Sequence, residues 1–199
     1  MNVLIVAKTR VGGAVCVGAL DAHGSSLRLY EPNWSFPPSN SPYQVGQLWD
    51  MSLVSRPTTQ PPHVEDVAVT KAKHVGQVPN LTAHLRQRIT PWTGGVAALF
   101  EGKLGFTSNG RGYVEEPNLP SRSTWFWTPD RELQRATIGG KVYYRSGGQE
   151  ISYVGVDQPI ATIPANALVR VSLARWWRPP DADPSFPVRC YLQLSGWYL

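Results

Sequence analysis

The chain has 199 residues, enough for one domain or two small ones, and its 42% apolar and 17% charged residues exclude a disordered polypeptide that cannot build a core. Its net charge of +5, with 14 Arg against 5 Lys, favours a polyanionic partner because guanidinium groups match phosphate and stack on bases. No stretch approaches the ~20 apolar residues of a membrane span, and the first residues lack the features of a signal peptide, so we expect a cytoplasmic protein with no membrane partner.

Short strands separated by Gly-rich and Pro-rich turns are predicted throughout the first part of the chain. Five of them are expected, at residues 2–8, 14–20, 26–31, 46–56 and 64–71. Alternation of apolar and polar residues is clearest at 27–30 and 48–53. Five short strands in roughly 70 residues are typical of a small barrel of the OB type, and an SH3-like barrel would fit the same count. We therefore predict an OB-like barrel over residues 1–76.

The middle of the chain has a different pattern. Leu81, Leu85 and Ile89 recur every four residues behind Asn80, a favoured N-cap residue, which predicts a helix over residues 80–88. A second short helix is expected to follow the Gly-rich turn at residues 93–95, and residues 102–120 are expected to form a loop. These segments constitute a helical insert over residues 77–120.

Strands return in the last part of the chain. They are predicted at residues 124–127, 135–138, 141–145, 151–155, 168–173 and 188–194, with a hairpin turn at Gly139-Gly140. The simplest architecture has a second OB-like barrel over residues 121–199. The predicted fold is therefore mostly β, with two small OB-like β-barrels joined by a short helical insert.

The first predicted strand leads into a basic segment formed by Lys8, Thr9 and Arg10, followed by Gly12-Gly13. Two cations, a hydroxyl and glycine amides could together bind a phosphate group. The alternative is a solvated turn with ion pairs. The spacing is not that of a Walker A loop.

A second basic segment, with Arg175, Trp176, Trp177 and Arg178, follows a strand near the other end of the chain. Adjacent side chains on a strand point to opposite faces, so we expect one of the two Trp residues to be exposed between the Arg residues. Stacking of a base on such a ring is worth ~1–3 kcal/mol. The alternative places one Trp in the core and the other beneath the Pro-rich loop that follows.

The chain has one cluster of acidic and imidazole side chains, His63, Glu65 and Asp66. His63 and Glu65 would share a strand face and could bind a metal or share a proton. Two side chains do not make a metal site, and the alternative is a strand opening with ion-pair roles. Cys16 and Cys190 are expected to be small buried apolar residues. No zinc-protease or serine-hydrolase motif occurs, which favours a binding protein without a cofactor over an enzyme.

Several stretches of the chain match a known pattern: residues 3–20, 27–29, 45–49, 62–67, 173–177 and 192–198. On these stretches the chain resembles the bacterial dual OB domain proteins, which carry two OB folds in one polypeptide of about this length. The resemblance implies binding of nucleic acid or a nucleotide, often beside enzymes of prokaryotic defence systems. It supplies no catalytic residues, but it gives more weight to His63, Glu65 and Asp66, which lie in a matching stretch.

The sequence thus predicts non-catalytic binding of single-stranded RNA or DNA, or of a nucleotide-like ligand. Phosphates would be bound by Lys8, Arg10, Arg175 and Arg178, and a base would stack on Trp176 or Trp177. One alternative is a metal-dependent nuclease or nucleotide hydrolase that uses the acid–imidazole cluster. The other is an adaptor whose exposed Trp residues and Pro-rich loops dock a partner protein.

Overall fold

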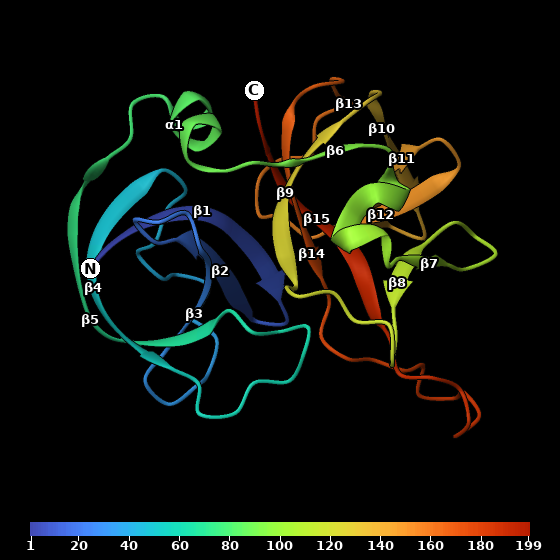
Figure 1. The fold of residues 1–199 in the computed structure, drawn as a ribbon, viewed down its shortest axis with the longest axis horizontal. Helices are drawn as coiled ribbons and strands as arrows, with labels where there is room; N and C mark the ends of the chain where they lie inside the picture. Colours follow the sequence, from blue (N-terminus) through green and yellow to red (C-terminus); the bar gives the residue numbers. More distant parts are fainter.

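The computed structural model describes all residues, 1–199, which form two β-rich halves lying side by side (Figure 1). The first half is a closed five-stranded barrel with the strand order β1-β2-β3-β5-β4. Its strands are β1 (Asn2–Val11), β2 (Ala14–Leu20), β3 (Ser26–Tyr30), β4 (Gln47–Ser55) and β5 (Asp66–Gln77). All neighbours are antiparallel except β3 and β5, and the start of β1 closes the barrel on β4. This is a Greek-key barrel, which confirms the OB-type prediction.

Strand β5 differs most from its predicted bounds, because it begins at Asp66 and continues to Gln77. Its second part pairs with β4 through two register shifts, and the residues from Thr70 to Val75 are exposed. These β5 residues are exposed on both faces even though their partners in β4 include the buried Trp49 and Met51, so this part of β5 leaves no apolar alternation in the sequence.

Strand β1 is buried on both faces, which explains its uninterrupted apolar sequence. Val3 and Ile5 point into the core of the first barrel. Leu4 and Val6 point the other way, into a second core that forms where the two halves meet.

The middle of the chain contains the predicted helix α1 (Leu81–Arg88). The side chain of Asn80 caps it by accepting a hydrogen bond from the Ala83 amide at 2.9 Å. The expected second helix is a 3-10 helix, η1 (Val96–Gly102), which is kinked where Phe100 and Glu101 take positive φ angles. None of the helices has the length and apolar character needed to cross a membrane.

Three very short strands occupy segments where the sequence predicts a turn or a loop: β6 (Trp92–Gly94), β7 (Gly105–Phe106) and β8 (Gly112–Val114). Strand β6 pairs with β9, and β8 pairs with β7 and with β15. The partners β9 and β15 belong to the second half, so these strands depend on distant segments rather than on local pattern.

The second half has the strands β9 (Thr124–Pro129), β10 (Leu133–Ile138), β11 (Lys141–Ser146), β12 (Gln149–Tyr153), β13 (Thr162–Ile163), β14 (Leu168–Leu173) and β15 (Cys190–Tyr198). Strands β10, β11 and β12 form a meander, β12 runs parallel to β15, and β14 lies between β15 and β9. Because only residues 130–132 separate β9 from β10, these two act as one bent first strand. The second half therefore repeats the strand order of the first, with β6 and β13 added at the edges.

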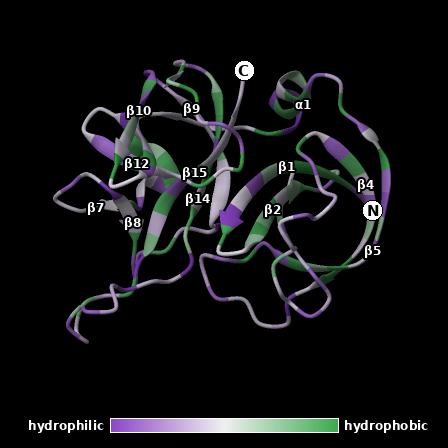
Figure 2. Cartoon of the chain, turned by 180° about the vertical axis from the view of Figure 1, so that it is seen from behind, coloured by the Kyte–Doolittle hydropathy of each residue, from purple (hydrophilic) through white to green (hydrophobic).

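The two halves share a core between them. Strands β1, β14 and β15 lie at this junction (Figure 2). Backbone hydrogen bonds continue across it, from the Arg10 amide to the Val154 carbonyl at 2.9 Å and from the Val156 amide to the Lys8 carbonyl at 3.1 Å. The shared core consists of nine buried side chains from both halves and the segment that contains α1: Leu4, Val6, Leu20, Val78, Leu85, Ile89, Phe126, Leu168 and Tyr198.

Candidate functional site

A buried carboxylate, Asp66, joins the two halves at the start of β5. It is 2% exposed. Its oxygens accept hydrogen bonds from Arg28 Nη1 at 2.8 Å, from Arg175 Nη2 at 2.7 Å and from Arg56 Nη1 at 3.2 Å. Arg175 also donates to the Tyr30 hydroxyl. One carboxylate thus faces three guanidinium groups, and Arg175 comes from the half of the chain opposite to the others.

The neighbouring carboxylate, Glu65, holds the segment before β9. It accepts from the Ser123 amide at 2.6 Å and from the Ser123 hydroxyl at 2.8 Å, while Arg28 Nη2 donates to the same hydroxyl at 2.7 Å. Burial acts to lower the pKa of Arg28, but neighbouring acidic groups, including Glu65 and Asp66, outweigh it and raise that pKa. Arg28 is therefore a fixed cation within this junction.

His63 lies in the same place but outside any strand. Its Nδ1 is 3.4 Å from Arg28 Nη1, and its Nε2 is 3.6 Å from the sulfur of Cys190. Burial, followed by the positive charges of Arg28 and Arg175, lowers the pKa of His63 to about 2, so its ring is neutral. No group of three or more His, Cys, Asp or Glu side chains in the structure is placed to hold a metal ion. The structure therefore brings His63, Glu65 and Asp66 together as contacts between the halves.

The first basic segment belongs to β1, and only its glycines form a turn. Lys8 is buried, its Nζ donates to the carbonyls of Ser41 and Tyr43 at 3.1 and 3.2 Å, and burial lowers its pKa. The Arg10 guanidinium donates to the carbonyls of residues 155 and 156 at 2.7 and 2.9 Å. Both cations therefore bind backbone carbonyls of the protein.

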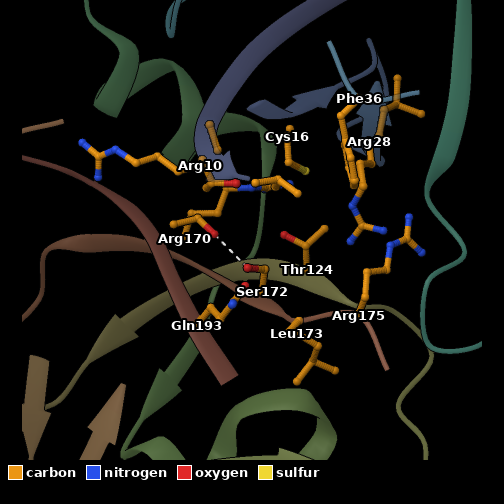
Figure 3. Close-up of a pocket in the computed structure, with 17 residues that line it drawn as sticks. Arg10, Cys16, Arg28, Phe36, Thr124, Arg170, Ser172, Leu173, Arg175 and Gln193 are labelled. Carbon is orange, nitrogen blue, oxygen red and sulfur yellow. Dashed lines mark hydrogen bonds between the residues drawn. The ribbon is translucent and has the colours of Figure 1, made fainter. Parts of the chain in front are cut away.

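A pocket of ≈ 260 Å³ lies between the halves. Strands β1, β2 and β3 form one side of it, and β9, β14, β15 and the segment after β14 form the other. Thr9, Arg10 and Arg175, predicted from opposite ends of the sequence, all line it. Figure 3 shows the side chains of Arg28 and Arg175 approaching each other at one side of the hollow, while that of Arg10 points away at the other.

A fourth arginine in the pocket wall, Arg170, was not singled out from the sequence. It lies in the middle of β14 and is 1% exposed. Its guanidinium lies over the ring of Phe126, 4.7 Å from the ring centre, and burial lowers its pKa. In the sequence, Arg170 could have been noticed as a single charged residue within the apolar run at residues 168–173, because charged residues are rarely buried.

The two Trp residues of the second basic segment lie in different surroundings. Trp176 is half-buried and its Nε1 donates to the Pro61 carbonyl at 3.0 Å. Trp177 is 49% exposed. The structure thus separates the two rings, in a segment that lies beyond the end of β14 rather than on the strand itself. Arg178 is exposed, and its Nη1 donates to the Pro184 carbonyl at 2.6 Å.

Trp177 continues a row of aromatic rings on the surface of the second half. Its ring centre is 5.9 Å from that of Tyr191, which is 6.1 Å from that of Tyr113. Arg189 lies over Tyr113, 3.8 Å from the ring centre, and forms an ion pair with Glu115 at 2.7 Å. We call Tyr113, Tyr191 and Trp177 the aromatic row. Sequence reasoning missed both Tyr residues, because Tyr113 lies on β8 and Tyr191 lies on the part of β15 that pairs with it.

The two cysteines differ from each other. Cys190 is fully buried, and burial raises the pKa of its thiol to about 12. Cys16 was expected to be buried, but it is partly exposed and lines the pocket. It lies on the outer face of β2, at a position where the second half leaves the hollow open.

Comparisons with known proteins give one match. A family model described as a dual OB-containing domain matches residues 1–197. No curated protein and no solved structure matches the chain.

Proposed function

The chain belongs to the family of dual OB-containing domains, and from this premise we propose that it binds single-stranded nucleic acid, without catalysis, on the aromatic row of its second half. OB folds bind oligonucleotides and other ligands on an exposed face of the barrel and on the loops beside it. Binding to single strands needs flat rings on which bases stack and cations that follow the backbone. The aromatic row and the arginines beside it offer both.

The observation that carries this proposal is the exposure of Trp177. A Trp ring with 49% exposure leaves a large apolar face in water, where a base could cover it. Its edge contact with Tyr191 fixes the orientation of the ring. Trp176, in contrast, anchors the loop through its hydrogen bond to the first half. The proposal assigns stacking to Trp177 and positioning to Trp176.

Two arginines would supply the charge along this face. Arg178 is exposed and contacts only its own loop, so its guanidinium is available to a phosphate. Arg189 is held between Tyr113, Phe186 and Glu115. Its role is to fix the rings of the row while adding to the local positive charge.

The test is fluorescence anisotropy with labelled single-stranded RNA, single-stranded DNA and duplex DNA. We expect Trp177→Ala to weaken single-strand binding by roughly 5- to 150-fold, which corresponds to the ~1–3 kcal/mol of one stacked base. Trp177→Phe keeps a stacking surface and should lose less. Ile138→Ala is the matched control, because it shortens an exposed apolar side chain at the end of β10, outside the aromatic row, and this variant should bind as the wild type does.

The phosphate contact assigned to Arg178 is tested by the salt dependence of binding. For single strands, the slope of log affinity against log salt changes by about 0.7 for each phosphate contact. Arg178→Ala should reduce the slope by about that amount. Unchanged affinity and slope in both the Trp177 and the Arg178 variants would contradict the proposed face.

A further inference from the structure

Arg170 is a buried cation without an acidic partner. Its Nη1 makes no hydrogen bond, and the only hydrogen bond of its Nη2 is a long one, 3.4 Å, to the Ser26 hydroxyl. Burying a charge without a partner costs several kcal/mol, so proteins rarely do so without a use for the charge. Because Arg170 lines the pocket between the halves, an anion in that pocket would supply the missing partner.

The surroundings of the pocket carry excess positive charge. Arg28, Arg170 and Arg175 are among the lining residues, which include no Asp or Glu; Arg10 also lines the pocket, but its guanidinium points away and binds backbone carbonyls. The nearby carboxylates are already engaged, since Glu65 is bound to Ser123 and Asp66 to three arginines. Neither forms an ion pair with Arg170. Four guanidinium groups, those of Arg28, Arg56, Arg170 and Arg175, thus lie around two carboxylates, and a ligand with two negative charges would balance the remaining charge.

The remaining lining suits a small polar ligand. Ser172 and Ser195 present hydroxyl groups that are 2.9 Å apart, joined by the dashed line in Figure 3. The absence of a side chain at Gly18 leaves a small space beside the guanidinium of Arg170, which a Cβ would fill in ordinary contact, 3.5 Å from two of its nitrogens. The volume of ≈ 260 Å³ is below the ~300–1,000 Å³ of pockets for drug-sized ligands. It fits a compact ligand rather than a strand of several nucleotides.

We propose that this pocket is a second binding site, which takes a phosphomonoester group with Arg170 at its base and Arg28 and Arg175 at its side. A phosphomonoester carries nearly two negative charges at neutral pH and accepts the paired hydrogen bonds that guanidinium groups donate. The site lies apart from the aromatic row and does not depend on the function proposed for it. Two sources share this chemistry: a free small molecule such as a nucleoside 5′-monophosphate, and the phosphorylated end of a nucleic acid.

Cys16 provides a direct readout in the wild-type protein. It lines the pocket and is partly exposed, whereas Cys190 is fully buried with a raised thiol pKa. A small neutral thiol reagent such as methyl methanethiolsulfonate should therefore modify Cys16 first. We expect inorganic phosphate and a nucleoside 5′-monophosphate to slow this reaction several-fold. The unphosphorylated nucleoside, and potassium chloride at equal ionic strength, should leave the rate unchanged.

A set of oligonucleotides separates the two sources. Protection by the nucleoside monophosphate but not by a 5′-phosphorylated oligonucleotide indicates a free small molecule as the ligand. Protection by the phosphorylated oligonucleotide, absent with the same oligonucleotide lacking its phosphate, indicates a nucleic-acid end. If no phosphorylated compound changes the rate of Cys16 modification, the proposal is wrong.

The variant Arg170→Met tests the assigned residue. It removes an unpaired buried charge, so in phosphate-free buffer we expect a melting temperature at least equal to that of the wild type. Phosphate should raise the melting temperature of the wild type but not that of the variant, and should no longer protect Cys16. Arg88→Met, which removes an exposed charge on α1, is the control and should respond as the wild type does.

A purely structural role for Arg170 gives the opposite result: a less stable variant that still responds to phosphate, which would overturn the assignment. If the variant does not fold, the Cys16 experiment on the wild type decides the question. Failure of this site is distinguishable from failure of the aromatic row. Trp177→Ala should leave the protection of Cys16 by phosphate unchanged, and Arg170→Met should leave the binding of single strands that lack a terminal phosphate unchanged.

Discussion

Replacement of Asp66 by Asn tests how the junction between the halves is stabilised. The change keeps the size of the side chain but removes the charge that faces Arg28, Arg56 and Arg175. Arg56 and Arg175 are partly exposed and can turn to water, whereas Arg28 is buried and cannot. Removing one member of a buried pair costs about 3–5 kcal/mol, because the other charge stays buried without a partner.

For a chain of this length each kcal/mol lowers the melting temperature by about 2–4 °C, so we expect Asp66→Asn to melt roughly 6–20 °C below the wild type. Thermal unfolding followed by circular dichroism at neutral pH measures the difference. Asp50→Asn is the matched control, because Asp50 is exposed and its ion pair with the N-terminal amine, at 2.9 Å, is worth less than about 1 kcal/mol. A loss below ~2 °C for Asp66→Asn would refute the view that this carboxylate compensates a buried guanidinium.

Three further outcomes follow from the structure. The pKa of His63 is lowered to about 2, so its imidazole takes up a proton near pH 6.5 in the unfolded chain but stays neutral in the folded protein. The free energy of unfolding should then fall by up to ~1.4 kcal/mol per pH unit as the pH drops below 6.5, and His63→Gln should flatten this dependence in urea titrations. Leu168→Ala, at a fully buried position of the shared core, should cost about 2–5 kcal/mol by the same assay. Gly24→Ala should lower the melting temperature, because Gly24 has a φ of +82° and a Cβ would lie 2.8 Å from the Arg88 carbonyl oxygen. An unchanged melting temperature would show that the turn at Gly24 can shift to accept a side chain.

The strands of the first barrel could be predicted because their information is local. Alternation in β3 and β4, together with the turns between strands, marks each of them in the sequence. The uninterrupted apolar run of β1 even indicates that both its faces are covered. Strands β6, β7, β8 and β13 have two or three residues each, and they exist because a partner strand lies beside them. No local pattern encodes such a partner.

The candidate sites were only partly predictable for a similar reason. The sequence identifies Lys8 and Arg175 as cations beside strands, but it does not show that Lys8 binds backbone carbonyls or that Asp66 neutralises Arg175. Those partners come from distant parts of the chain. Trp177 is more exposed than Trp176, as the sequence predicts for one of the two rings, but both lie beyond the end of β14, so strand alternation does not explain the difference. Arg170 carried a signal, an isolated charge in an apolar strand, that composition and motif searches pass over.

The two-faced burial of β1 has a consequence for how the pocket recognises a ligand. Since the same strand contributes to the core of the first barrel and to the core between the halves, opening the halves would expose the apolar side chains of the shared core to water. The pocket is therefore already formed before any ligand arrives. Binding would not have to offset the entropy of closing two domains, so even a compact anion with few contacts could be held there.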